Sequence, residues 1–226
     1  NEETPSFVEF ITGPGGVIDT WLRRGAAGFR LDVADELPDA FIEKIRAAVK
    51  RVSPEKFLLG EVWEDATTKY GFGHRRTYLL GKGLDSVMNY PFKNAVLDFV
   101  KGKPAEQAAG EILSICEHYP APALNTALNF LSTHDTERAL TVIADEPANG
   151  RGREWQSGRN VSGEAYEEGM LRLRMAYAII YTLPGLPCLY YGDEIGMQGY
   201  RDPFNRGYYC WDSHEERLKP VLAQLA

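Results

Sequence analysis

Charged side chains interrupt an apolar run early in the chain, where a buried strand should carry none. Residues 28–36 read Gly-Phe-Arg-Leu-Asp-Val-Ala-Asp-Glu, and their alternation predicts a β-strand. Successive side chains of a strand point to opposite faces, so Arg30 and Asp32 emerge on the same side. A neighbouring guanidinium keeps a carboxylate ionised, as a nucleophile requires. Taken alone, such a pair is more simply an ion pair that closes a strand.

Two further predicted strands end in acids. Residues 57–63 (FLLGEVW) predict a short buried strand that delivers Glu61, and residues 128–133 (LNFLST) predict one that is followed by His134 and Asp135. The loops that follow parallel strands meet at one end of the sheet, so acids at three strand ends indicate one catalytic site.

Two such acids can together cleave a glycosidic bond. One carboxylate attacks the anomeric carbon, and a second, protonated carboxyl gives its proton to the leaving oxygen. Arg30 favours the first role for Asp32. Glu61 stands among apolar residues beside Trp63, and an apolar wall would preserve its proton. The Trp63 ring could also stack on a sugar.

Short apolar strands alternate with amphipathic helices along the whole chain. The patterns predict strands at 28–36, 57–63, 84–90, 128–133 and 187–191, and helices at 6–24 (interrupted at 13–16), 38–50, 91–100, 105–119, 164–183 and 215–225. Segment 66–82 is expected to be a loop with a short helical piece. This alternation is typical of a parallel sheet with right-handed crossovers. Five strand and helix units are fewer than the eight that close a barrel, so we expect an α/β fold that is part of a TIM (β/α)8 barrel, with sheet edges that need a partner.

Composition excludes several classes of protein. The 226 residues carry a net charge of −7, which argues against nucleic acid or an anionic membrane surface as the main partner. No window is long and apolar enough to span a membrane. The three cysteines form neither a disulfide framework nor a zinc motif. We therefore expect a neutral substrate, no metal site in this chain, and a reducing, cytoplasmic location.

Several short motifs together resemble a known family. Residues 28–36 (GFRLDVADE), 60–63 (GEVW) and 131–135 (LSTHD) are similar, in this order, to the second, third and fourth conserved regions of the α-amylase family of glycoside hydrolases. Residues 183–196 resemble its eighth barrel strand and the following loop. Residues 33–36 (VADE) and 202–206 (DPFNR) are most similar to the neopullulanase, cyclomaltodextrinase and maltogenic amylase group.

The resemblance implies a retaining mechanism on α-glucans. It makes Asp32 the nucleophile, Glu61 the acid/base and Asp135 the third, stabilising carboxylate, while Arg30 and His134 line the subsite of the cleaved bond. The other implied binding residues lie on either side of that subsite: Asp202 and Arg206 on the non-reducing side, and Glu36 and Trp63 on the opposite side.

The resemblance also places residues 1–226, as a single domain, at about strands 4 to 8 of the catalytic barrel. The first strands, the family's first conserved region and any accessory domains are then expected before Asn1, and the isolated chain should be inactive. No cofactor is required, and Ca²⁺ would belong to the full-length protein. The expected partners are α-glucan oligosaccharides, the remainder of the barrel and a second copy of the full-length protein in a homodimer.

Alternatives remain open at this stage. The full-length protein could hydrolyse α-1,4 and also α-1,6 glucosidic bonds in starch-derived glucans or cyclodextrins, transfer glucan with the same acids, or serve as a non-catalytic binding module. Asp35 could simply cap the helix that begins near Pro38. Trp155 and Trp211 could stack on glucan or pack on their own loops.

Overall fold

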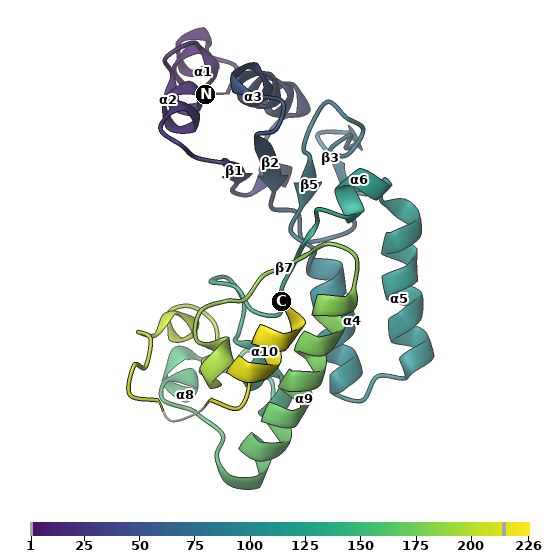
Figure 1. The fold of residues 1–226 in the computed structure, drawn as a ribbon, viewed down its shortest axis with the longest axis vertical. Coiled ribbons are helices and arrows are strands. Elements are labelled where there is room, and N and C mark those ends of the chain that lie inside the picture. The colour runs from purple at the N-terminus through teal and green to yellow at the C-terminus, as the bar shows by residue number, and fades with distance from the viewer. Residues whose placement is uncertain (1, 214–215) are drawn as a thin grey trace. The chain divides into compact units, whose positions relative to one another are not determined.

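The computed structural model describes residues 2–213 and 216–226, which form two compact units (Figure 1). The first unit comprises Asn1–Pro91 and Leu113–Leu128, and the second comprises Phe92–Ile112 and Asn129–Ala226. The predicted site residues are divided between the two units. Asp32 and Glu61 belong to the first unit, and segments 131–135 and 202–206 belong to the second. None of the helices described is long and apolar enough to cross a membrane.

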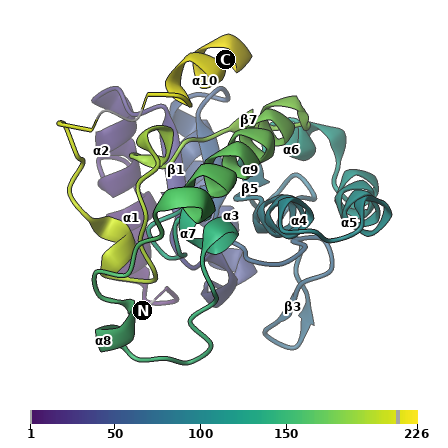
Figure 2. The same cartoon turned by 90° about the horizontal axis from the view of Figure 1, so that it is seen from below.

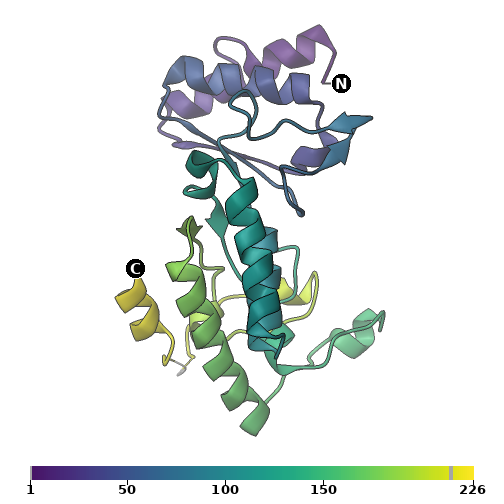
Figure 3. The same ribbon diagram turned by 90° about the vertical axis from the view of Figure 1, so that its right-hand side faces the viewer.

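A parallel sheet forms the centre of the first unit. Its strands, in spatial order, are β1 (Gly28–Leu31), β2 (Phe57–Gly60) and β5 (Ser86–Val87). A parallel bridge joins Met88 to Leu128. Helices pack together on one side of these strands (Figure 3): α1 (Pro5–Thr12), α2 (Val17–Arg23) and α3 (Asp39–Val52). The predicted helix at 6–24, broken at its glycines, and the predicted helix after Pro38 are both confirmed.

Two glycines allow the first strands to pack closely. A Cβ on Gly28 would lie 2.0 Å from the Phe57 carbonyl oxygen, and a Cβ on Gly60 would lie 2.2 Å from Cδ1 of Leu84. A larger residue at position 28 would therefore push β1 away from β2, whereas one at position 60 would displace the Leu84 side chain.

The segment after Glu61 differs from the prediction of a loop with a helical piece. It contains an antiparallel hairpin of β3 (Tyr70–Gly71) and β4 (His74–Arg75). Phe72 and Gly73 connect the strands with φ angles of 53° and 79°, and two consecutive positive φ angles match the twist of a tight hairpin. The helical expectation is wrong because this turn chemistry, and not helical periodicity, decides the local structure.

Helices dominate the second unit. Most of α4 (Tyr90–Val100) belongs to it, and α7 (Ala139–Ala144) packs against α9 (Gly163–Thr182) (Figure 2). The final helix, α10 (Lys219–Leu225), also packs on α9 (Figure 3). The core of the unit is apolar and includes Val96, Leu97, Leu131, Leu140, Ile143, Leu173, Tyr177, Ile180 and Leu222. The predicted helices at 91–100 and 164–183 are confirmed, while the start predicted at 215 lies outside the described residues.

Shorter elements complete the chain. The strands β6 (Leu128–Asn129) and β7 (Leu186–Pro187) pair, and the remaining helices are α5 (Ala105–His118), α6 (Ala121–Leu124), α8 (Arg153–Gln156) and the 3₁₀ turns η1 (Ala34–Glu36), η2 (Asp193–Ile195) and η3 (Phe204–Arg206). Both β6 and β7 end before the predicted strands do, because residues 130–133 and 188–192 continue as loops. The first of those loops leads directly to His134 and Asp135.

Candidate active site

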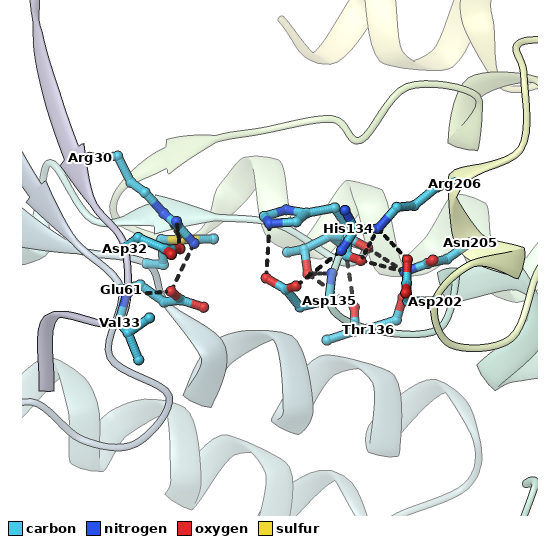
Figure 4. Close-up of polar contacts among 12 residues, drawn as sticks. Arg30, Asp32, Val33, Glu61, His134, Asp135, Thr136, Asp202, Asn205 and Arg206 are labelled. Carbon is cyan, nitrogen blue, oxygen red and sulfur yellow. Dashed lines mark hydrogen bonds and ion pairs between the residues drawn. The ribbon is translucent and has the colours of Figure 1, made fainter. Parts of the chain in front are cut away.

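The ends of β1 and β2 bring three of the predicted site residues together. Leu31 pairs with Gly60 in the parallel register, so Asp32 and Glu61 are the next residues at the same level of neighbouring strands. Arg30 Nη1 donates to Asp32 Oδ1 at 2.5 Å, and Arg30 Nη2 lies 3.0 Å from Glu61 Oε2 (Figure 4). One guanidinium therefore contacts both carboxylates: Nη1 donates a hydrogen bond to Asp32, and Nη2 forms an ion pair with Glu61 without hydrogen-bond geometry.

The two carboxylates differ in their access to solvent. The side chain of Asp32 is 75% exposed, so a substrate can approach it. Glu61 is buried, and its Oε2 accepts a hydrogen bond from the Val33 N–H at 2.8 Å while its Oε1 accepts one from Trp63 Nε1 at 2.9 Å. The expected apolar wall around Glu61 is therefore wrong, because the turn after β1 and the indole N–H both face the carboxylate.

Val33 has an unusual backbone conformation. Its φ angle is 45°, in the left-handed region, where a β-branched residue is strained. The next amide, of Ala34, donates to the Glu61 carbonyl at 3.1 Å. The turn after Asp32 is thus bound to both the side chain and the backbone of Glu61. Nothing in the residue type of Val33 indicates this role, and sequence reasoning missed it.

Trp63 is partly available as a platform for a sugar. Its ring stacks on Tyr90 with centroids 4.3 Å apart and planes inclined by 12°, yet 44% of the residue remains exposed. One face is therefore packed within the protein, and the remainder can meet a ligand.

The two acids that follow Val33 do not join this cluster in the described contacts. Glu36 is exposed in η1, and no described contact links its side chain to Arg30 or to either acid. The Asp35 carboxylate lies 3.1 Å from Lys69 Nζ. The alternative that Asp35 caps the next helix is wrong, because Pro38 occupies the N-cap position of α3.

The second unit holds the other predicted site residues in one connected group. His134 Nε2 lies 3.0 Å from Asp135 Oδ2, and Arg206 Nη2 lies 3.5 Å from Asp135 Oδ1 (Figure 4). Arg206 Nε contacts Asp202 Oδ1 at 2.8 Å and donates to the His134 carbonyl at 3.1 Å. Segments 131–135 and 202–206 are therefore neighbours within this unit.

Asn205 joins these two segments and was missed by sequence reasoning. It is fully buried, and its Nδ2 donates to the carbonyls of His134 at 2.7 Å, Thr136 at 2.8 Å and Thr133 at 3.3 Å (Figure 4). The signal available in the sequence was its place between the predicted binding residues Asp202 and Arg206.

The loop tryptophans behave differently from each other. The guanidinium carbons of Arg151 and Arg159 each lie 4.4 Å from the centroid of the Trp155 ring. The Tyr200 ring centroid lies 5.2 Å away, so Trp155 packs against its own loop and against Tyr200. Trp211 is 86% exposed, and its ring lies 4.7 Å from that of Tyr209.

Within residues 2–213 and 216–226, no three His, Cys, Asp or Glu side chains are placed to hold a metal ion.

The chain belongs to the α-amylase family. Residues 1–220 match the family model described as "Alpha amylase, catalytic domain". The chain is 33% identical over 243 residues to an amylopullulanase of Thermoanaerobacter thermohydrosulfuricus, and the alignment covers 97% of the chain and 15% of that protein. It is 34% identical over 223 residues to a cyclomaltodextrinase of a Bacillus species, and this alignment covers 96% of the chain and 34% of that protein.

A solved structure shows the same fold. The cyclic α-maltosyl-(1→6)-maltose hydrolase of Arthrobacter globiformis, in complex with maltose, superposes with a TM-score of 0.78 at 26% identity, covering 100% of this chain and 44% of that one. The chain therefore has the fold of part of an α-amylase catalytic domain, and it spans about a third or less of the length of the curated relatives compared above. The expected family is confirmed, and cyclomaltodextrinase is among its relatives, as the sequence predicts.

Proposed function

We propose that the full-length protein is a retaining glycoside hydrolase that cleaves α-1,4, and also α-1,6, glucosidic bonds in starch-derived glucans or cyclodextrins. In this proposal, β1, β2, β5, β6 and β7 are strands 4 to 8 of its TIM barrel. The observation that carries the proposal is the Arg30 guanidinium, which holds Asp32 and Glu61 at matched ends of adjacent strands. A retaining mechanism needs two carboxyl groups at short range, about 5–5.5 Å apart.

The proposed reaction has two steps. Asp32 attacks the anomeric carbon, the glycosidic bond breaks, and Glu61 gives its proton to the leaving oxygen. Glu61 then takes a proton from water, the resulting hydroxide attacks the anomeric carbon, and Asp32 is released as a carboxylate. The exposure of Asp32 and the burial of Glu61 support this assignment, because the nucleophile must reach the sugar directly.

The group in the second unit would hold the sugar. We propose that Asp135 accepts hydrogen bonds from hydroxyls that the distorted ring presents in the transition state, and that His134 donates one to the same unit. The contacts among Asp135, Arg206 and Asp202 support a continuous polar surface that extends to the next sugar. Trp63 and Glu36 would serve the opposite side of the cleaved bond.

The solved relative in complex with maltose supports an α-glucan oligosaccharide as the ligand class. We also propose that the remainder of the barrel is a required partner, that the full-length protein forms a homodimer, and that no cofactor takes part.

The products from maltotriose test the proposal. With full-length protein, glucose and maltose should appear from the earliest times, and Asp32→Asn should abolish the reaction. Early oligosaccharides longer than maltotriose would identify a transglycosylase instead. No reaction, with maltotriose still bound, would identify a binding module.

A further inference from the structure

A buried carboxylate holds both ends of the loop that presents His134 and Asp135. Asp193, in η2, is 1% exposed. Its Oδ2 accepts a hydrogen bond from Ser132 Oγ at 2.6 Å, and its Oδ1 accepts one from Arg138 Nη1 at 3.2 Å. Ser132 and Arg138 are themselves buried, and they stand directly before and after the loop. The two oxygens of one carboxylate thus bind its two ends.

The Arg138 end of the loop depends on the charge of Asp193. The guanidinium of Arg138 lies over the rings of Tyr190 and Tyr191, 4.7 Å and 4.8 Å from their centroids, and Nη1 donates to the Tyr191 carbonyl at 2.7 Å. In the described part of the chain, Asp193 is the carboxylate that lies within ion-pair distance of Arg138. A buried guanidinium without a counter-ion is strongly unfavourable. Asp193 therefore stabilises this end of the loop, together with the Gly199 carbonyl, which accepts from the Arg138 N–H at 2.9 Å.

Other contacts also hold the loop: besides the Arg138 N–H, which donates to the Gly199 carbonyl, the Ala139 N–H donates to Ser132 Oγ at 2.8 Å. Residues 132–138 form neither a helix nor a strand, so no backbone ladder fixes them. Asn205 holds the middle of the loop through the carbonyls of His134 and Thr136. Asn205 and Arg206 therefore hold the middle of the loop. Asp193 is the group that binds side chains at both of its ends.

We propose that Asp193 is a positioning residue for Asp135. By binding Ser132 and Arg138, it fixes the loop in the arrangement in which Asp135 and His134 form hydrogen bonds with the sugar in the transition state. This inference rests on the proposed function. It adds to the reaction a residue that touches no substrate and that acts through both ends of one loop.

The network offers a matched pair of variants that tests this. Ser132 Oγ and Tyr177 Oη both donate to Asp193 Oδ2 at 2.6 Å, and both residues are buried. Ser132 adjoins the loop, whereas Tyr177 lies in α9. Ser132→Ala and Tyr177→Phe each remove one hydroxyl from the same oxygen. Ser132→Ala also removes the acceptor of the Ala139 N–H, so only this variant loosens the loop.

The expected result, with full-length protein and maltotriose, is a kcat about 10- to 100-fold lower in Ser132→Ala, because a small misplacement of a catalytic group has an effect of this size. KM should change little. Tyr177→Phe should keep kcat within about twofold of wild type, although both variants should lower the midpoint of thermal unfolding. If Ser132→Ala does not fold, Ser132→Cys, which keeps a weaker donor of similar size, is measured with the same expectation.

Two results would overturn the inference. Equal kcat values in the Ser132 and Tyr177 variants, whether both lowered or both unchanged, would show that the hydrogen bonds to Asp193 are purely structural. Activity of the wild-type protein would still support the proposed function in that case. A wild-type protein that does not hydrolyse maltotriose would overturn the proposed function and the positioning role together.

Discussion

In the proposed reaction, Glu61 is the general acid, and its carboxyl must exchange one of its present contacts for the leaving oxygen of the substrate. Its carboxylate meets the Arg30 guanidinium, the Val33 amide and the Trp63 indole, so its direction is fixed before substrate arrives. Preorganisation of this kind is what places a proton donor within reach of the leaving oxygen.

Replacement of Glu61 by Gln in the full-length protein should lower kcat/KM for maltotriose by about 10²- to 10⁴-fold, the usual contribution of a general acid. An aryl maltoside with a good leaving group should lose far less, because that group needs no proton. The control is Glu64→Gln, three residues along the chain, whose side chain is 61% exposed and pairs with Lys69. Equal losses on both substrates would remove Glu61 from the acid role.

Val33 allows a second prediction at this scale. Glycine adopts a positive φ without the strain that a Cβ imposes, so Val33→Gly should raise the free energy of unfolding by about 1 kcal/mol after the entropic cost of glycine. Val33→Ala keeps the Cβ and serves as the control. Chemical denaturation of both variants measures the difference. A Val33→Gly variant less stable than Val33→Ala would contradict the assignment of strain.

At the residue level, the period of a strand was enough to predict the Arg30 and Asp32 pair, and strand ends were enough to predict the position of Glu61. The donors around Glu61 could not be predicted, because they come from a backbone turn at Val33 whose φ no residue type signals. Asn205 and Asp193 were missed for a related reason. The loop residues that Asn205 binds lie 69 to 72 positions away along the chain. Ser132 and Arg138, which Asp193 binds, lie 61 and 55 positions away from it.

At the scale of elements, Asp193 binds both ends of the loop between Ser132 and Arg138, and its contribution to stability depends on pH. Burial raises the pKa of the Asp193 carboxyl from 3.8 to about 6, against the opposing effect of the Ser132 and Tyr177 hydroxyls and of Arg138. The carboxyl is therefore ionised at neutral pH, as its pairing with Arg138 requires. Because the pKa is higher in the folded state than in the unfolded state, the contribution of Asp193 to stability is fully present below pH 4 and is lost as the pH rises through 6.

The thermal unfolding of wild type and Asp193→Asn, compared from pH 4 to pH 7, measures this contribution. The wild-type midpoint should fall relative to that of the variant over this interval, because Asn does not titrate. A difference between the two midpoints that does not change with pH would show that Asp193 keeps its usual pKa in the fold.

The long helices were predictable because their apolar faces repeat over several turns, as in α3 and α9. The strands were predictable in position but not in length: β6 and β7 have two residues each. Apolar character continues beyond them, but the chain has already turned into loops. The β3–β4 hairpin was missed because its φ angles at Phe72 and Gly73, and not its hydrophobic pattern, define it.

For the whole molecule, the chain corresponds to a fraction of its relatives, and β1 pairs on one side only among the described strands. A parallel barrel strand needs a neighbour on each side. The 226-residue chain purified alone should therefore show no measurable hydrolysis of maltodextrins, whereas the full-length protein should. Release of reducing sugar by the isolated chain would contradict this.

The most direct test of the account is to trap the glycosyl-enzyme. Full-length protein incubated with a slow fluorinated maltosyl donor, digested and mapped by mass spectrometry, should carry one maltosyl group on the peptide that contains Asp32, and Asp32→Asn should carry none. A maltosyl group on any other residue, or no adduct from a protein that still hydrolyses maltotriose, would contradict the central claim that Asp32 is the nucleophile of a retaining glucan hydrolase.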